Sequence, residues 1–447
     1  MILAIIAKLK TIKTGLNNAR VRILTKIKQS VPLILPALRK HGDILLLALA
    51  LAVLVSALIR TPLKKVIPHP REKNIQFTLW QQGSIGKEYL DNFINEFESI
   101  HKNIKIYIKE TKYEELKNDL FDKNEGISGD ILALDTLWIP ELNQNLQIES
   151  INAPVLSFIN VLYYNVNILR EAGFTKPPKS RNDFLNCARA VADRDQNRWG
   201  LAMDLNSSRG IYDDIFPWIY SSGVRLIKEG KPALTSRQVI ESLSFLSLLN
   251  GEGLIGVFSA ISGDKLQKFI SGRTAFMIAP ACWIEYVRKM MGEEAFGITS
   301  VPAPDGIPDP TGAASEKRGS LQDDNKGKIY FSSAGWTVGI SSSSVHREEA
   351  LLFRDFIAEK AVLMPETTGA IPETGVPMTS GDPLYSKLWD IAISGEIAND
   401  FTGLPWNELD SIFREELLRL FSAGSGEQIK PDETAAAIQE RWEKVIN

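Results

Sequence analysis

The sequence predicts an α/β protein that is built on a parallel, doubly wound sheet and is preceded by one N-terminal transmembrane helix. Three observations lead to this fold class. Segments with the periodicity of strands and of helices alternate after residue 74, an apolar run without charges precedes them, and the composition is that of a globular protein. Each observation also limits the classes of function that the chain can have.

The composition excludes several classes of protein. Of the 447 residues, 44% are hydrophobic and 23% are charged, which are globular proportions. The length corresponds to about two or three domains. The two cysteines, Cys187 and Cys282, are too few for a disulfide framework, and the four histidines lack the HExxH spacing of a zinc enzyme. We therefore expect neither a metal nor a cofactor.

Charge is divided unevenly along the chain. Residues 1–42 contain nine cations and no acid, whereas residues 43–447 contain 42 cations and 54 acids. A net-acidic body is poorly matched to the phosphates of nucleic acids. Positive charge ahead of an apolar run is typical of the cytoplasmic side of a membrane span. We therefore expect no nucleic-acid partner and a basic cytoplasmic leader at residues 1–42.

The apolar run occupies residues 44–59, which contain no charge and only one hydroxyl, that of Ser56. Its sixteen residues fall between the about 17–25 of a spanning helix and the about 7–15 of a signal-peptide core. The small residues around Ser56 also fit a cleavage site, so cleavage is an open alternative. Our working prediction is a retained transmembrane or signal-anchor helix at 43–60 in the lipid bilayer. Residues 61–74 then form a proline-containing tether to an extracytoplasmic body.

The first part of the body alternates strand and helix patterns. Apolar residues alternate with polar ones in 75–79 and again in 104–108, and 130–134 is a short apolar strand. Between them, residues 90–97 and 113–120 carry apolar side chains at helical spacing. This β-α-β-α-β order predicts parallel strands, and ligands of such sheets bind beyond the carboxyl ends of the strands. The places to look are therefore 80–83 and 135–138.

The remainder of the chain continues in the same way. We expect strands at 161–165, 275–278 and 331–340, and helices that follow a capping box at Ser180 and Asp183, that run from Ser236 to Asn250, and that span 346–360. Residues 302–327 are rich in Pro, Gly and Asp and predict a long loop. The carboxyl end from Asn407 to Asn447 is expected to be helical.

Nine segments in unbroken order resemble the extracellular solute-binding proteins of ABC importers, in the family of maltose-type and other carbohydrate binders. The segments are FTLWQQGSIG (77–86), GDILALDTLW (129–138), VLYYNVNILREAGFTKPPKSRNDFLNCA (161–188), WGLAMD (199–204), FPWIYSSGV (216–224), FISGRTAFMIAPACW (269–283), FGITSVPAPDG (296–306), AGWTVGI (334–340) and GAIPE (369–373). Each is weak alone, and the ordered set is specific. Residues 269–283 are similar to the family pattern FxxGKxAMxIxGPW, with Ala-Cys where the family has Gly-Pro.

Two features depart from the family. Val161 follows Trp138 by only 23 positions, far fewer than the family places there, so the first lobe is shortened in the region 139–160. The second departure is the predicted transmembrane helix, which replaces a lipoprotein signal.

The resemblance implies a two-lobe periplasmic-binding-protein-like fold with hinge strands over 75–447. Lobe 1 would comprise about 75–163 and 336–370, and lobe 2 about 164–335 and 371–447. The implied function is that of the extracellular substrate-binding subunit of an ABC importer, without enzymatic activity. It would bind a carbohydrate or a related polar solute between the lobes and deliver it to a permease in the membrane.

Eight residues are candidate ligand contacts, because aromatic rings stack on the apolar faces of sugars and polar groups bind their hydroxyls. They are Trp80, Gln81, Gln82, Asp135, Trp218, Trp283, Gly335 and Trp336. Each has a structural alternative, such as a tryptophan in the core, a turn at Gln81 and Gln82, or a helix cap at Asp135. Tyr164 and Asn165 are expected at the hinge.

Catalytic readings are weaker. The sequence contains no GxGxxG, GxxxxGK[ST] or GxSxG motif. Two alternatives to an importer subunit remain. One is a ligand-sensing receptor module for another membrane protein, which the basic leader motivates. The other is an extracellular carbohydrate-active enzyme, since spacing alone does not exclude a pair of catalytic carboxylates.

Overall fold

The computed structural model of the chain describes residues 72–80, 87–121, 129–139, 141–142, 148–149, 156–257, 264–306, 329–361, 369, 380–422 and 429–447. The predicted leader, the predicted membrane helix, Gln81, Gln82 and most of the loop at 302–327 lie outside these residues. Within the described part of the chain, no helix combines the length and the apolar character that a membrane span requires.

The first lobe begins with the predicted β-α-β-α-β unit. Strand β1 (Lys73–Trp80) pairs in parallel with β2 (Ile104–Thr111) and with β3 (Ile131–Asp135). The two connections are α3 (Lys87–Ile100) and α4 (Tyr113–Phe121). The prediction of parallel strands with helical crossovers is therefore confirmed for this lobe.

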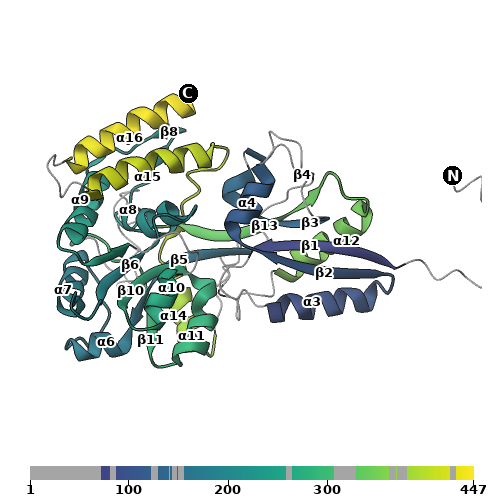
Figure 1. Cartoon of the computed structure of the whole chain (residues 1–447), viewed down its shortest axis with the longest axis horizontal. Coiled ribbons are helices and arrows are strands. Elements are labelled where there is room, and N and C mark those ends of the chain that lie inside the picture. Colours follow the sequence, from purple (N-terminus) through teal and green to yellow (C-terminus); the bar gives the residue numbers. More distant parts are fainter. Residues whose placement is uncertain are drawn as a thin grey trace, which may run out of the picture. The chain divides into compact units, whose positions relative to one another are not determined.

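The two faces of β1 bury different partners. Phe77 contacts Phe353 of α12 (Arg347–Ala361), with 5.9 Å between the ring centroids. Trp80 lies on the opposite face, where its ring is 5.7 Å from that of Tyr113 in α4. Since side chains three residues apart in a strand point to opposite faces, one strand packs against both helical layers. Figure 1 shows α3 and α4 on opposite sides of these strands.

Two long strands link the lobes. Residues 156–159 of β5 (Leu156–Asn165) pair with β13 (Ser333–Ser341), which also pairs with β3 and with β4 (Ile148–Glu149). From Asn160 onward, β5 pairs instead with β10 (Thr274–Pro280) and β11 (Phe296–Thr299). The chain therefore passes from the first sheet to the second at Ile159 and Asn160. The resulting order is β2-β1-β3-β13-β5-β10-β6-β9.

The second lobe is a mixed sheet between helices. Its parallel strands β6 (Trp199–Met203), β9 (Ile255–Val257) and β10 alternate side chains into two cores. Phe276 and Ile278 of β10 face one core, and Met277 and Ala279 face the other. The helices are α6 (Val166–Glu171), α7 (Arg181–Val191), α8 (Phe216–Tyr220), α9 (Arg237–Gly251), α10 (Asp264–Ile270), α11 (Ile284–Met291), α14 (Pro383–Ala392), α15 (Trp406–Ser422) and α16 (Pro431–Ile446). Short strands pair as β7 (Ile227–Lys228) with β8 (Lys231–Pro232) and as β12 (Tyr330–Phe331) with β14 (Glu396–Ile397).

The carboxyl-terminal helices complete the larger core of this lobe. Helices α15 and α16, drawn in yellow-green and yellow in Figure 1, pack side by side. The indole Nε1 of Trp442 donates to the Leu409 carbonyl at 3.0 Å, so a fully buried tryptophan has its polar atom satisfied. The predicted helical carboxyl end is confirmed as two helices.

Two predicted boundaries are wrong. Residues 331–340 do not form one strand, because Ser332 separates β12 from β13 and its carbonyl accepts a 3.0 Å hydrogen bond from the Asn160 amide. Helix α9 includes Gly251 rather than ending at Asn250. The capping box of Ser180 and Asp183 at α7 is present as predicted, whereas the Ser236 side chain makes no cap hydrogen bond at α9.

Candidate functional site

The candidate site lies where parallel strands of both lobes end. In the first lobe β1 ends at Trp80 and β3 ends at Asp135. In the second lobe Asp204 follows β6, and the short helix η4 (Ala281–Trp283) follows β10. Ligands of open α/β sheets bind at such carboxyl ends. Two groups of ion pairs lie here, Asp135–Arg209–Asp213 and Asp214–Lys265, and the backbone amide of Asp204 donates to Asp214. We call these six residues the interlobe polar cluster.

Asp135 is fully buried, and both of its oxygens accept hydrogen bonds. Oδ1 accepts the Leu137 amide at 2.9 Å, which is the helix-cap role that the sequence left open. Oδ2 accepts the Tyr113 hydroxyl at 2.8 Å and also the guanidinium of Arg209 from the second lobe. Burial, followed by the charge of Asp135, raises the pKa of Tyr113 well above its ordinary value. The phenol therefore stays protonated and acts as the donor.

Arg209 joins the two lobes. It forms an ion pair with Asp135, donates to Asp213 through Nε and Nη2, each at 3.0 Å, and donates to the Ser333 carbonyl at 3.2 Å. Burial by itself would lower the pKa of the guanidinium, but Asp135 and Asp213 hold that pKa well above its ordinary value. The adjacent Gly210 allows its backbone to pass close to that of Asp204, because a Cβ there would lie 2.1 Å from the Asp204 carbonyl oxygen.

A second group of charged residues lies next to Asp213 in the second lobe. Asp213 and Asp214 lie on the π-helix η3 (Ile211–Ile215), and the Lys265 ammonium is 2.7 Å from Asp214 Oδ1. The Asp204 amide donates to Asp214 Oδ2 at 2.7 Å. Burial raises the pKa of Asp214 to about 6, against the opposing effect of Lys265. Burial also raises the pKa of Asp204.

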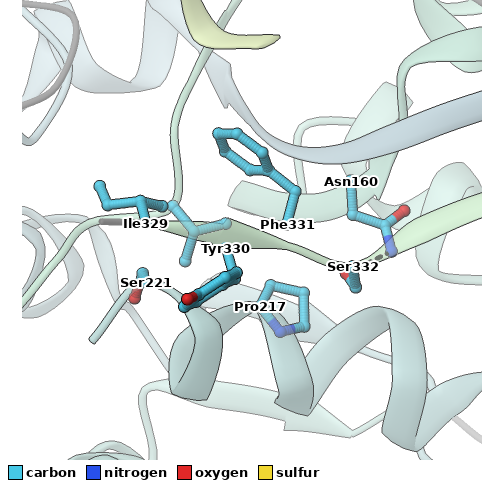
Figure 2. Close-up of a pocket in the computed structure, with 8 residues that line it drawn as sticks. Asn160, Pro217, Ser221, Ile329, Tyr330, Phe331 and Ser332 are labelled. Atoms are coloured by element: carbon cyan, nitrogen blue, oxygen red, sulfur yellow. Dashed lines mark hydrogen bonds between the residues drawn. The ribbon is translucent and has the colours of Figure 1, made fainter. Parts of the chain in front are cut away.

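Asn160, at the point where β5 changes sheets, connects the cluster to a small cavity. Its Nδ2 donates to Asp213 Oδ1 and to Ser332 Oγ, each at 2.9 Å. Figure 2 shows Asn160 and Ser332 at one end of the cavity, with Pro217, Ser221 and Tyr330 around it. The cavity has a volume of only about 10 Å³, far below the about 300–1,000 Å³ of most ligand pockets.

Aromatic side chains border the cluster in both lobes. The rings of Tyr113 and Trp138 are 4.7 Å apart, and those of Trp80 and Trp138 are 5.5 Å apart. Both tryptophans are buried, and among the described residues neither indole Nε1 has a hydrogen-bond partner. Trp283 is half-buried, and the Lys265 ammonium lies 5.9 Å from the centroid of its ring.

Two further contacts cross between the lobes. Glu114 of α4 accepts hydrogen bonds from the amide of Ser208, at 2.8 Å, and from its hydroxyl. Glu141 accepts from the Asn407 amide at 3.0 Å and from its Nδ2 at 2.8 Å, at the start of α15. Among the described residues, the hydrogen bonds of Glu114 and Glu141 therefore add to the ion pair of Arg209 in joining the first lobe to the second.

The structure brings some predicted ligand contacts to this place. Asp135 belongs to the interlobe polar cluster, and Trp80 and Trp283 border it. Trp218 lies elsewhere, fully buried in the second-lobe core against Phe184, with 4.9 Å between the rings. Gly335 is a buried residue of β13.

The remaining predictions concern three candidate ligand contacts whose side chains the structure does not describe, and the two hinge residues. The Trp336 side chain, Gln81 and Gln82 lie outside what the structure describes. Asn165 caps α6, since its Oδ1 accepts the amides of Asn167 and Ile168 at 3.1 Å each. Tyr164 packs closely on Gly297, where an added Cβ would be 2.3 Å from its hydroxyl oxygen. The ligand and hinge roles of all ten residues stay predictions.

Sequence reasoning missed Arg209, Lys265 and Asn160. Arg209 and Asp213 stand four residues apart, which brings the two side chains together on a helical turn. That spacing can be recognised in the sequence, but the partner of Arg209 in the first lobe, Asp135, cannot. Within the described residues, no group of three His, Cys, Asp or Glu side chains is arranged to hold a metal ion.

Comparison with known proteins gives the class first and then the family. The two sheets, linked by β5 and β13, define a two-lobe α/β protein of the periplasmic-binding-protein-like class. The family model of the bacterial extracellular solute-binding proteins matches residues 83–364, and the chain belongs to this family. The suspected membership is therefore confirmed.

Solved structures share the fold. An ABC transporter solute-binding protein from Thermotoga lettingae, bound with α-D-tagatose, has a TM-score of 0.65 and 16% identity, over 84% of this chain and 100% of that one. The GacH receptor of Streptomyces glaucescens, solved unliganded and with acarbose, has a TM-score of 0.63 and 16% identity, over 84% and 98%. Maltose-bound MalE3 from T. maritima has a TM-score of 0.63 and 16% identity, over 82% and 98%. At this identity the likeness concerns the fold.

Proposed function

We propose that the chain is the extracytoplasmic substrate-binding subunit of an ABC importer, and that it binds a carbohydrate or related polar solute between its lobes. The observation that carries this proposal is the interlobe polar cluster, which lies at strand ends of both lobes in a member of the solute-binding family. A ligand that contacts both lobes stabilises their closed arrangement, and a permease reads that arrangement. ATP hydrolysis belongs to other subunits.

The proposed ligand contacts are Asp135 of the cluster together with the bordering Trp80 and Trp283. A carboxylate that already accepts from Tyr113 and Arg209 is held in a fixed orientation, which suits recognition of sugar hydroxyls. The half-buried ring of Trp283 offers an apolar face for the C–H side of a sugar. The contributions of Trp218, Gly335, Trp336, Gln81 and Gln82 remain part of the proposal.

The proposal includes the membrane anchor and the lobes as the sequence predicts them. Residues 43–60 would hold the protein in the bilayer, with 1–42 in the cytoplasm and 61–74 as a tether to the binding domain at 75–447. Lobe 1 would consist of about 75–163 and 336–370, and lobe 2 of about 164–335 and 371–447, with the hinge at Tyr164 and Asn165.

Thermal unfolding of the full chain against neutral and amino sugars, oligosaccharides and polyols tests the proposal. A ligand at 100 times its dissociation constant adds about 2.7 kcal/mol to the free energy of unfolding, so the unfolding temperature rises by a measurable amount. A selective rise that Trp283→Ala abolishes supports the proposal. A folded chain that responds to none of these compounds contradicts it.

The same preparation separates the other functions. Co-purification of a permease supports delivery to an importer, and co-purification of a signalling protein supports the alternative of a sensor, which the basic leader favours. Release of shorter products from a glycan panel would indicate a carbohydrate-active enzyme. We expect no such release, because the family consists of binding proteins.

A further inference from the structure

We infer that the interlobe polar cluster selects a hydroxyl-bearing ligand that carries a protonated amine, and that it rejects anionic sugars such as sugar phosphates and uronic acids. This inference rests on the proposed function and adds the charge class of the ligand to it.

The charge balance of the cluster is the first argument. Arg209 is shared by Asp135 and Asp213, and Lys265 is shared by Asp214, to which it bonds, and Asp204, on which it acts through space. Four carboxylates therefore face two cations, and two negative charges are left over. Because an uncompensated buried charge is costly, a cation that enters this site is favoured and an anion is opposed.

Neighbouring charges do not remove the excess. Glu114 lies beside Lys117, since both contact Ser208, and Asp410 is paired with Arg414 at 2.6 Å. Each set contains one acid and one cation, so neither set changes the balance of charge. Asp264 adds a further negative charge near Asp204 and contributes to the rise in the pKa of that residue. The field at the cluster is therefore negative.

Unpartnered acceptors are the second argument. Asp204 is 6% exposed and Asn160 is 2% exposed, yet Asp204 Oδ1 and Asn160 Oδ1 have no hydrogen-bond partner in the described part of the chain. Both residues bond to the cluster, Asp204 through its amide to Asp214 and Asn160 through Nδ2 to Asp213. Buried acceptors need donors. An ammonium and hydroxyl groups provide these donors, and the hydroxyl oxygens of the same ligand provide acceptors for the unpartnered indole N–H groups of Trp80, Trp138 and Trp283.

The geometry favours an organic cation over a metal ion. In the described residues no three carboxylate, imidazole or thiolate groups are placed to hold one ion. The carboxylates of Asp135 and Asp213 lie on either side of Arg209, and the neighbouring Asp214 accepts from the Asp204 amide. An amine on a polyhydroxylated ring matches this arrangement, since its donors and the ring hydroxyls are spread over the length of a sugar.

The test is calorimetric titration of the full chain near pH 7 with matched sugars of different charge. One series is glucosamine, glucose, glucuronic acid and glucose 6-phosphate, and the other is the disaccharide of glucosamine, its N-acetylated form and cellobiose. We expect each amine to bind about tenfold more tightly than its neutral counterpart, because charge-assisted hydrogen bonds are about twice as strong as neutral ones. We expect no detectable binding of the two anions.

Variants connect the preference to the cluster. Asp204→Asn keeps the shape and removes one negative charge, so the amine and its neutral counterpart should bind with similar affinity. Asp213→Asn should have the same effect on the two affinities. Because the Asp213 side chain is 14% exposed, this variant replaces Asp204→Asn if the latter does not fold. Asp91→Asn on the exposed face of α3 is the control and should leave the tenfold preference unchanged.

Three results would overturn the inference. They are equal or tighter binding of the neutral sugars, binding of either anion, and an absence of binding across both series. The first leaves the proposed function intact, because a neutral sugar is then the ligand. The third removes the amine preference, and the wider panel of neutral sugars and polyols decides separately on the proposed function.

Discussion

Arg209 holds a position on which both lobes depend, because its guanidinium faces Asp135 of the first lobe and Asp213 of the second. Only 10% of its side chain is exposed, so water does little to screen the charges that its removal would leave. Breaking a buried ion pair by removing one partner is far more destabilising than losing an exposed pair.

We predict that Arg209→Met lowers the free energy of unfolding by about 3–5 kcal/mol. A double-mutant cycle with Asp135→Asn should give a coupling energy above about 1 kcal/mol, measured by denaturant unfolding. The matched control is Arg189→Met, which removes a pair with Glu252 whose side chains are 48% and 31% exposed. This control should change stability by less than about 1 kcal/mol. Equal effects of the two substitutions would show that Arg209 does not link the lobes.

Asp214 predicts a pH dependence of stability. Burial raises its pKa in the folded protein to about 6, from the ordinary value of 3.8. Between these pH values the folded chain binds more protons than the unfolded chain. The stabilising contribution of Asp214 to the free energy of unfolding is therefore complete below pH 3.8 and is lost as the pH rises through about 6.

Relative to wild type, Asp214→Asn should therefore gain stability as the pH rises from 4 to 6.5, by about 2–3 kcal/mol. Chemical unfolding of both proteins at several pH values measures the difference. A flat difference, or one that falls with pH, would contradict the assignment.

At the scale of the element, two serines at helix starts form a matched pair. Ser180 Oγ accepts the Asp183 amide at 3.2 Å and completes a capping box, whereas Ser236 makes no cap hydrogen bond. We predict that Ser180→Ala lowers the free energy of unfolding by about 1 kcal/mol and that Ser236→Ala changes it by a few tenths at most. Thermal unfolding of the two variants distinguishes these outcomes, and an equal loss would refute the difference between the caps.

The helices and strands also show which parts of the fold could be predicted from the sequence. Alternation in β1 and β2 and the apolar stripes of α3 and α4 were readable because each repeats over several residues. The break at Ser332 was not readable. It results from a hydrogen bond to Asn160 and from the pairing of β12 with β14, and both partners are distant in sequence.

The site was readable only in part, for the same reason. Asp135 and Trp80 are marked by their positions at strand ends, whereas Asn160 and Lys265 owe their roles to contacts with Asp213 and Asp214. Trp218 looked similar to a ligand contact in sequence, yet it packs against Phe184 in a core. The sequence pattern of a tryptophan that follows a proline does not distinguish a ligand contact from a core residue.

At the scale of the whole molecule, the proposed anchor at 43–60 has a direct test. The full chain should remain with membranes after an alkaline carbonate wash, because about sixteen consecutive apolar residues favour the bilayer interior. Leu51→Arg, near the middle of the run, costs about 2.5–3.5 kcal/mol for insertion and should release part of the protein. Full-length protein in the soluble fraction would contradict the anchor, as would a mature chain that begins near Leu58.

The central claim is that a carbohydrate or related polar solute binds at the interlobe polar cluster. Calorimetric titration of the full chain with neutral and amino sugars, oligosaccharides and polyols tests it most directly, with Asp213→Ala as the variant and Asp91→Asn as the control. We predict saturable binding of at least one compound, weakened by at least about tenfold in Asp213→Ala and unchanged in Asp91→Asn. Binding that Asp213→Ala leaves intact, or a folded wild-type chain that binds none of the compounds, would contradict the claim.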